Sequence, residues 1–551
     1  MTNALVPLIA VILSATPGSP QAVEPQDTLW RVGLPRGVFV DVHRQSLLDE
    51  HPSVTRSWIR AASDDVRWRL QLARESADRE RSFHVRLLAP EVDGAFNSDL
   101  PFSLNEGSLW AGRGLSGRTQ LGAVLSYGSV SLVLAPEVWA TANGAFQTFS
   151  YPEAPPRADN AGGRSRHPLA SPYHYPPHSM DLPQRLGSGA GASLGFGQSS
   201  LAWEKRSVRI GIATESMRWG PALRNPLMLS NNAQGFTHLF AQTTKPLDSP
   251  LGDVHAQWVL GDLQESEYFD FDPSNDHRSF SGAVIVLNPS FEPNLSLGVS
   301  RVVYAPASSR PDVLTAAFDV LTSVGTVASE PGDTLLTPGP DRLFSMFAHW
   351  SFPDAGMETW GEWGRAEEPE SLRDFLETPH HSRAYTFGLR HVRPITTSSR
   401  LSIEAELTSL EPSQAFRVKQ HGEWYASRRV VQGYTHRGRV IGAAIGPSGS
   451  SQWLAFDWLG QGWHVGLFGT RIRWENEALY SYAPEFRRAD VTLLAGLRGS
   501  GQIGRIGFEA AWAESIRLNY LFQTQPRPND TYRGVDLRNR VIRLTFWAAG
   551  S

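Results

Sequence analysis

Two glutamates separated by a single residue, Glu404 and Glu406, lie in a stretch where apolar and polar residues alternate. Because side chains two positions apart in a β-strand point to the same face, both carboxylates are expected on one face of a sheet. Glu509 and Arg517 occupy other alternating stretches of the same kind. Paired carboxylates can hydrolyse glycosides by acid–base catalysis, but inside a closed barrel they would line the lumen with arginines as partners. We expect these four residues to line a lumen, and we assign no catalytic residue.

Aromatic rings and hydrogen-bonding side chains are concentrated in two further stretches, from Gly211 to Pro246 and from Trp424 to Arg437. Flat rings pack against the C–H faces of sugars, while arginine and asparagine bond the hydroxyl groups, so both stretches fit a glycan site. Both also fit a rigid structural loop packed into the mouth of a barrel, and composition leaves the two interpretations open. The candidate glycan-binding residues are Arg218, Trp219, Arg224, Asn225, Asn231, Asn232, Tyr434, His436 and Arg437.

Motifs for metal or cofactor binding are missing from the sequence. It contains no His-Glu-x-x-His pair, no phosphate-binding P-loop and no Gly-x-Ser-x-Gly elbow between a strand and a helix. The acidic run from Asp270 to Asp276 could offer oxygen ligands to Ca²⁺, but it also fits an acidic turn built around Pro273. The chain has no cysteine, which excludes disulfides, Cys-ligated zinc, iron–sulfur clusters and a thiol nucleophile. We therefore expect no cofactor and no metal.

Composition limits the partner and the compartment. The 551 residues carry a net charge of −4, so a nucleic-acid partner held by a basic surface is not expected. An apolar run from Ala4 to Ala15, followed by proline and small residues, predicts a signal peptide over residues 1–22. That run is too short to cross a membrane as a helix. Residues 23–62 contain the main helix-like segments and are expected to form a short helical or loop element.

Alternation with a period of two dominates residues 63–551. In one example, the apolar residues Leu401 and Ile403 alternate with Ser402 and a glutamate. About 16 to 20 such segments are present, roughly what a barrel of this size needs at about 10 residues per strand. The alternation is interrupted at three expected long loops, near residues 151–186, 306–341 and 365–380.

Alternation by itself does not separate a soluble β-sandwich from a membrane barrel. A sandwich turns its apolar faces inward, whereas an outer-membrane barrel turns them toward lipid and places polar residues in the lumen. The export signal, the number of segments and tryptophans near strand ends favour the barrel, because barrels carry aromatic girdles at both interfaces. The tryptophans expected near strand ends are Trp110, Trp139, Trp350, Trp360, Trp363, Trp458, Trp463 and Trp474.

Several longer motifs are spread in order over residues 100–475. The longest is ESMRWGPALRNPLMLSNNAQGF at 215–236, and others are NEGSLWAGRG at 105–114, EWGR at 362–365 and QGYTHRG at 432–438. Together these motifs resemble the Wzi family of capsule-assembly proteins.

The resemblance implies an all-β fold, a closed antiparallel transmembrane barrel of eighteen strands with a small periplasmic helical element near the N-terminus. It also implies a non-catalytic, lectin-like protein of the outer membrane that binds capsular or exopolysaccharide and attaches it to the cell surface. The expected partners are that polysaccharide, the lipid bilayer and other components of capsule export. Two alternatives stay open: a substrate-specific porin or polysaccharide export channel, and a secreted all-β glycosidase.

Overall fold

A computed structural model gives the fold of the chain. It describes residues 59–61, 83–148, 167–171, 173, 179–322, 339–366, 372–413, 424–476, 478–479, 488–527 and 531–548. Within these residues, no helix combines the length and the apolar character needed to cross a membrane.

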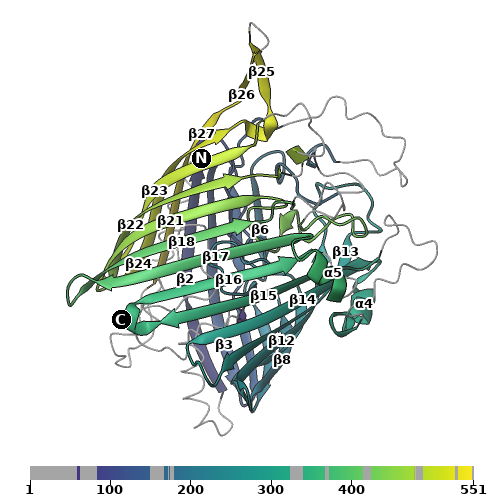
Figure 1. Ribbon diagram of the computed structural model, residues 1–551, viewed down its shortest axis with the longest axis vertical. Coiled ribbons are helices and arrows are strands. Elements are labelled where there is room, and N and C mark those ends of the chain that lie inside the picture. Colours follow the sequence, from purple (N-terminus) through teal and green to yellow (C-terminus); the bar gives the residue numbers. More distant parts are fainter. Residues whose placement is uncertain are drawn as a thin grey trace.

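Eighteen antiparallel strands close into a barrel (Figure 1). Three wall positions are each filled by two short strands: β4 with β5, β6 with β7, and β10 with β11. The wall strands, in chain order, are β2 (Phe83–Asn97), β3 (Gly114–Tyr127), β4 (Val130–Leu134), β5 (Glu137–Thr141), β6 (Gly191–Gly195), β7 (Ser200–Lys205), β8 (Val208–Ala213), β10 (His238–Thr243), β11 (Leu247–Ser249), β12 (Gly252–Gln264), β13 (His277–Pro289), β14 (Leu295–Ala307), β15 (Asp341–Phe352), β16 (Met357–Arg365), β17 (Arg383–Pro394), β18 (Ser399–Ser409), β21 (Ser450–Gly460), β22 (Trp463–Arg473), β23 (Val491–Ile503), β24 (Ile506–Leu518) and β27 (Leu537–Ala548).

The first and last wall strands close the barrel. β2 pairs with β3 on one side and with β27 on the other, with Glu91 opposite Trp547. Consecutive wall strands are neighbours throughout, so the topology is a simple meander. Closure leaves no unpaired sheet edge, which a sheet inside lipid requires.

The two ends of the barrel differ in their connections. One end carries tight turns, such as the residues Gln461 and Gly462 between β21 and β22. β27 also finishes there, because Ala548 pairs with Ile506 at the start of β24. All the long connections lie at the opposite end, which we call the mouth. In outer-membrane barrels the short turns face the periplasm and the long loops face the outside.

Side chains alternate between the lumen and the outer wall. On β18, the side chains of Glu404 and Glu406 are buried inside the barrel, whereas that of Leu407 is exposed on the outer wall. An apolar outer wall with a polar interior is the arrangement of a membrane barrel rather than a soluble sandwich.

The predicted tryptophan girdle is confirmed in part. Trp350, Trp458 and Trp463 are exposed on the outer wall, near the end with the tight turns. The prediction is wrong for Trp360, which is 1% exposed, because its indole points inward and donates a 3.1 Å hydrogen bond to Glu406.

The long connections contain short elements of their own. They are β1 (Ile59–Ala61), β9 (Met217–Trp219), α4 (Arg310–Val313), η2 (Leu314–Ala316), η3 (Asp319–Leu321), η4 (Pro353–Ala355, in a tight turn), α5 (Leu372–Glu377), β19 (Thr435–His436), β20 (Arg439–Val440), η6 (Tyr520–Phe522), β25 (Thr524–Arg527) and β26 (Thr531–Gly534). The β25–β26 hairpin projects beyond the rest of the mouth (Figure 1).

Two long connections turn back into the lumen and fill it. They are residues 214–236 and residues 424–449, which we call the plug, and most of their side chains are buried. Plug and inner wall together form the main hydrophobic core of the molecule. The wall is continuous behind the second plug segment, because β18 pairs directly with β21.

The predicted N-terminal elements fall largely outside the described residues. The signal peptide at 1–22 lies wholly outside them. Of residues 23–62, only Ile59–Ala61 is described, and it is a strand that pairs with β9 of the plug rather than a helix. Most of the predicted loop at 151–186 is also outside, so the domain boundaries stay predictions.

Candidate functional site

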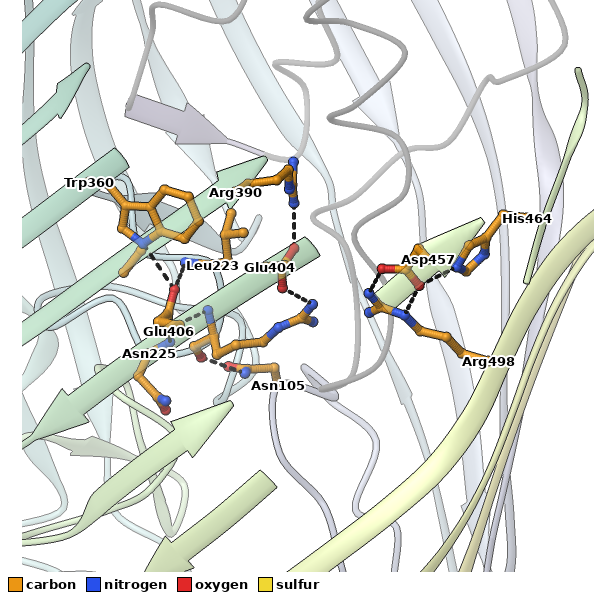
Figure 2. Close-up of polar contacts among 12 residues, drawn as sticks. Asn105, Leu223, Asn225, Trp360, Arg390, Glu404, Glu406, Asp457, His464 and Arg498 are labelled. Carbon is orange, nitrogen blue, oxygen red and sulfur yellow. Dashed lines mark hydrogen bonds and ion pairs between the residues drawn. The ribbon is translucent and has the colours of Figure 1, made fainter. Parts of the chain in front are cut away.

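Glu406 fastens the first plug segment to the wall (Figure 2). Its two carboxylate oxygens accept hydrogen bonds from three consecutive backbone N–H groups, those of Leu223, Arg224 and Asn225, at 2.6, 2.9 and 3.0 Å. The Trp360 indole donates a fourth. Consecutive backbone N–H groups form a concave nest that suits an anion, and here the anion is a side chain of the barrel itself.

Glu404, the neighbour on the same inner face, lies between two arginines. It accepts a hydrogen bond from Arg224 of the plug at 2.8 Å and one from Arg390 of β17 at 2.6 Å. Arg390 continues to Glu358 at 3.3 Å, and Glu358 contacts His349 at 2.8 Å. The arginines and glutamates of this group are all buried, and each has an opposite charge beside it, which is how a buried ionic network is tolerated.

Glu362 of β16 holds the next part of the plug. It accepts the backbone N–H of Leu227 at 3.0 Å and the hydroxyl of Ser345 at 3.0 Å. The turn at Gly220 passes directly over this carboxylate with a φ of 91°, and a Cβ at Gly220 would lie 3.0 Å from a Glu362 oxygen. Glycine is therefore required at this position both by the backbone conformation and by the close approach.

Another buried carboxylate, Asp457 of β21, has its partners in the wall. It accepts hydrogen bonds from Arg498 at 2.5 and 2.8 Å and contacts His464 at 2.8 Å (Figure 2). Figure 2 shows that this group and the Glu404 group come from different strands and both point into the lumen.

The two predicted aromatic–polar stretches come together in the plug. Tyr434 donates its hydroxyl to the carbonyl of Met228 at 2.9 Å, and Asn232 donates to the carbonyl of Val440 at 2.9 Å. The Tyr434 ring stacks on that of Tyr425 at 5.7 Å. Side chains of the two stretches therefore pack mainly against each other.

Most of the predicted glycan-binding residues are buried in this packing. Trp219 is 0% exposed, donates to Gln257 at 2.7 Å and packs against Phe280. The other buried members of the predicted set are Arg224, Asn225, Asn231, Asn232, Tyr434 and His436. Glycan contact by these side chains stays an untested prediction, but their burial favours the structural interpretation of the stretch.

Two arginines of the set keep some exposure. Arg218 is half-buried in β9 and donates to the carbonyl of Ala222, while Arg437 is exposed and donates to Gln264 at 2.8 and 3.1 Å. Beside Arg437, His436 accepts the backbone N–H of Gln264 on its Nδ1 atom at 3.0 Å. Burial, together with the nearby Arg437 and Arg278 guanidinium groups, holds the pKa of His436 well below its ordinary 6.5, so the imidazole is neutral.

The four predicted lumen-lining residues all lie on the inner wall. Glu404 and Glu406 hold the plug, and Glu509 is buried on the inner face of β24. Arg517, at the mouth end of β24, forms a two-pronged ion pair with Asp490 at 2.7 and 2.8 Å.

A cavity of about 200 Å³ opens at the mouth above the plug. Six connections contribute to it, so no single stretch of sequence contains the site. We call it the mouth cavity. Its aromatic lining consists of Trp110, Phe146, Tyr173, Trp474 and Tyr520, and its polar lining includes Ser103, Gln184, Asn232, Arg439, Glu475 and Arg517.

The lining of the mouth cavity is held in place by its own hydrogen bonds. Tyr173 donates to the carbonyl of Leu521 at 2.7 Å, and Tyr520 donates to that of Gln147 at 2.6 Å. The Arg517 guanidinium lies over the rings of Tyr520 and Trp474, 4.8 and 5.3 Å from their centroids. Rings fixed in this way are ready to pack against a ligand without further ordering, which lowers the entropic cost of binding.

Arg439 lines the cavity where the plug meets the connection between β2 and β3. Its guanidinium donates to the carbonyls of Gly107, Leu109 and Ser103 at 2.8, 3.0 and 3.1 Å. Burial lowers the pKa of Arg439 from its ordinary 12.5 to about 10, so it stays charged at neutral pH.

The family model for the capsule assembly protein Wzi matches residues 90–460 of the chain. The match covers more than half of the sequence, including the plug and thirteen of the eighteen wall positions, from β3 to β21. The chain belongs to the Wzi family. The predicted family, the closed barrel fold and the outer-membrane location are thereby confirmed.

The fold is also found in a solved structure. Wzi of Escherichia coli, described as an outer membrane protein involved in group 1 capsule assembly, aligns over 92% of this chain and 98% of its own, with a TM-score of 0.55 and 12% identity. OccK5 and OccK2 of Pseudomonas aeruginosa, the latter with glucuronate, align over 85% of this chain at TM-scores of 0.37 and 0.38 and identities of 9% and 10%. These alignments cover 99% and 98% of the two Pseudomonas chains. A search of curated proteins gave no match.

The sequence indicated two residues that line the mouth cavity of this Wzi-family chain, Asn232 as a glycan contact and Arg517 as a lumen residue, but not the cavity itself. Trp110 lies within the family motif at 105–114, so a signal was present, but nothing in the motif indicates a cavity rather than a girdle. Tyr173, Trp474 and Tyr520 lie in separate connections and meet only in the closed barrel. Among the described residues, no cluster of three or more His, Asp or Glu side chains could hold a metal ion.

Proposed function

We propose that this Wzi-family barrel holds capsular or exopolysaccharide at the outer surface of the cell, without catalysis, by gripping sugar units at the mouth cavity. The observation that carries the proposal is the mouth cavity itself, which fixed aromatic rings and hydrogen-bonding side chains line above a filled lumen. Rings and polar groups in this combination suit the C–H faces and hydroxyls of sugars. The related Escherichia coli protein is described as a carbohydrate-binding β-barrel, which agrees with this function.

Retention of a polymer needs only modest affinity at each site. Once one sugar unit is bound, its neighbours on the same chain stay at high effective concentration, so weak contacts add up. Arg218 and Arg437, the more exposed members of the predicted set, lie outside the cavity lining and could contribute such secondary contacts.

An open channel is disfavoured by the plug. A porin keeps an aqueous path through its lumen. Here Glu404, Glu406 and Glu362 bond residues 214–236 to the inner wall, and Arg278 of β13 donates to the carbonyl of Gly433 in the second plug segment at 3.0 Å. Displacing the plug would take from Glu404 one of its two arginines, from Glu406 its three backbone N–H donors and from Glu362 the N–H of Leu227. Breaking a buried pair in this way costs several kcal/mol.

Glycoside hydrolysis is disfavoured for a related reason. A hydrolase needs one protonated and one free carboxyl group facing a cleft. Glu404 and Glu406 share a face, but both are buried under the plug and are engaged by arginine or backbone N–H groups.

Binding and conductance, measured on the same preparation, test the proposal. We expect the full chain in lipid nanodiscs to bind the capsular polysaccharide of its source cells, and empty nanodiscs to bind none. In planar bilayers the same protein should show no steady conductance, and the polysaccharide should keep its chain length after incubation. Steady conductance would favour the export channel, shortening of the polymer would favour the glycosidase, and absence of binding would overturn the proposal.

A further inference from the structure

A short helical segment lies against the outer wall of the barrel instead of over its mouth. It consists of α4, η2 and η3, residues 310–321, which Figure 1 shows beside the mouth ends of β13 and β14. Its buried residues Val313 and Ala316 pack in one cluster with Leu260 of β12 and Ala307 of β14. On β12, Gln257 faces the lumen, where it bonds to Trp219, so Leu260 faces outward by strand alternation.

Polar side chains of the outer wall fasten this segment through its backbone. The Trp258 indole donates to the carbonyl of Ala317 at 2.9 Å, and the Ser281 hydroxyl donates to the same carbonyl at 3.3 Å. Ser281 also accepts the backbone N–H of Val320 at 3.2 Å. The segment therefore lies against the wall and gives Trp258 and Ser281 hydrogen-bond partners that lipid could not provide.

Arg301 of β14 provides the third fastening and fixes the depth of the segment. Its guanidinium donates to the carbonyls of Val320 and Thr322, the latter at 3.1 Å, at the carboxyl end of η3. Six residues toward the tight turns, Leu295 pairs with Trp350 of the girdle. At about 3.4 Å per residue and a tilt of about 40°, Arg301 lies roughly 15 Å above that girdle.

That depth places Arg301 within the apolar band, which is about 25 Å tall in outer-membrane barrels. An arginine facing hydrocarbon is unfavourable there, and the carbonyls of residues 320 and 322 cover it.

The segment turns a second set of side chains away from the wall. Leu314, Phe318 and Leu321 are 59%, 65% and 65% exposed. The Phe318 ring stacks on Trp258 at 6.2 Å, so the apolar wall continues onto the segment.

A second segment on the neighbouring strands repeats the arrangement. α5 places Phe375 edge-on against Trp363 of β16 at 5.8 Å and 6.0 Å from the Arg365 guanidinium. Arg365 is buried, while Leu372 and Leu376 of α5 are exposed. Figure 1 shows α4 and α5 on the same side of the barrel. Each segment therefore covers an arginine of the wall and presents apolar side chains outward.

We propose that residues 310–321 and 372–377, which we call the wall segments, are embedded in the outer leaflet of the membrane and bind lipid acyl chains. The lipid-facing wall runs without interruption onto both of them, so the occupant that already covers the wall covers them too. Short amphipathic helices with this distribution lie at the boundary between headgroups and hydrocarbon. The proposal rests on the barrel spanning the membrane and is independent of polysaccharide binding.

Site-directed spin labelling tests this directly, because the chain lacks cysteine and each introduced thiol is unique. Labels at Phe318→Cys and Leu376→Cys would be compared in phosphatidylcholine vesicles with two reference positions. Leu297→Cys lies on the outward face of β14 and reports lipid. Ser398→Cys lies in the tight turn between β17 and β18 and reports water. Heat-modifiable gel migration is used to check that each variant is folded. If Phe318→Cys does not fold, Leu314→Cys takes its place.

We expect both wall-segment labels to collide often with oxygen and rarely with a water-soluble nickel complex. Their oxygen-to-nickel ratio should match that of Leu297→Cys and exceed that of Ser398→Cys several-fold. A ratio equal to that of Ser398→Cys would place the segments in water and overturn the proposal. Low accessibility to both reagents would also overturn it, because a protein surface, such as a second copy of the chain, would then cover the segments.

Discussion

Glu406 shows how a carboxylate can fasten a loop rather than act on a substrate. Its oxygens accept three consecutive backbone N–H groups and the Trp360 indole, all in the buried interior. The same pair of glutamates in a cleft would have suited acid–base chemistry. The plug decides between these roles, because it covers both glutamates and supplies their partners. Leu223 of the plug precedes Glu406 by 183 positions in the chain.

Removing this carboxylate should release the plug locally. In Glu406→Ala the amides of Leu223, Arg224 and Asn225 lose their acceptor inside the barrel, at a cost of about 3 kcal/mol. We expect hydrogen exchange at these amides to become roughly 100-fold faster. Leu407→Ala, the next residue on the outward face, is the matched control and should leave them protected. Unchanged exchange in Glu406→Ala would contradict the assigned role.

A titratable group at the mouth should make stability depend on pH. Burial raises the pKa of Glu265 from its ordinary 4.5 to about 8, although its carboxylate accepts a 2.6 Å hydrogen bond from Gln432. Burial also raises the pKa of Asp181, whereas that of His436 is lowered. Between pH 4.5 and 8 the folded chain keeps a proton on Glu265 that the unfolded chain has lost, so stability falls as pH rises. His436 acts in the opposite direction, but only below pH 6.5.

The window from pH 6.5 to 8 therefore isolates the carboxyl groups. There we expect wild-type protein to lose roughly 1–2 kcal/mol of stability, and Glu265→Gln to lose less. Thermal unfolding of both proteins in the same detergent, followed across this window, measures the difference. Parallel curves for the two proteins would show that Glu265 does not carry a raised pKa.

Among the elements, the strands could be predicted and the plug could not. Alternation marks each wall strand, because one face of every strand meets apolar surroundings and the other meets polar ones. Alternation does not say which face of a strand meets the lumen. For this reason Trp360 was predicted to lie in the girdle, although its indole faces Glu406. For residues 214–236 the composition fits a surface loop or an inward one, and only the burial of Trp219 decides. The mouth cavity depends on contacts between distant connections, which no local pattern records.

The turn that carries the plug past Glu362 offers an element-level test. Gly220→Ala introduces a Cβ at positive φ and 3.0 Å from the carboxylate, so we expect about 1–3 kcal/mol of destabilisation. Gly462→Ala is the control, because it has a φ of 75° and no atom within 4 Å of the new Cβ. Chemical unfolding of both variants should show the larger loss for Gly220→Ala. Equal losses would mean that backbone strain alone is responsible and that the approach to Glu362 is unimportant.

At the level of the whole molecule, the barrel is closed and the proposed recognition surface lies at one end. The wall meets lipid, the plug fills the lumen, and the mouth cavity lies where the long connections gather. Such a molecule holds a polymer at the surface instead of passing it through. The prediction of a polysaccharide-binding barrel survives from the sequence, but the residues proposed to bind have moved from the Trp219 stretch to the cavity around Trp110.

Polysaccharide binding by two matched tryptophan variants tests this account most directly. Trp110→Ala removes a ring from the mouth cavity, whereas Trp458→Ala removes one from the outer wall at the opposite end. In nanodiscs, we predict about tenfold weaker binding for Trp110→Ala, equivalent to about 1.4 kcal/mol of lost ring contact, and wild-type binding for Trp458→Ala and for the buried Trp219→Phe. Wild-type affinity in folded Trp110→Ala, or an equal loss in Trp458→Ala, would contradict the assignment of the mouth cavity.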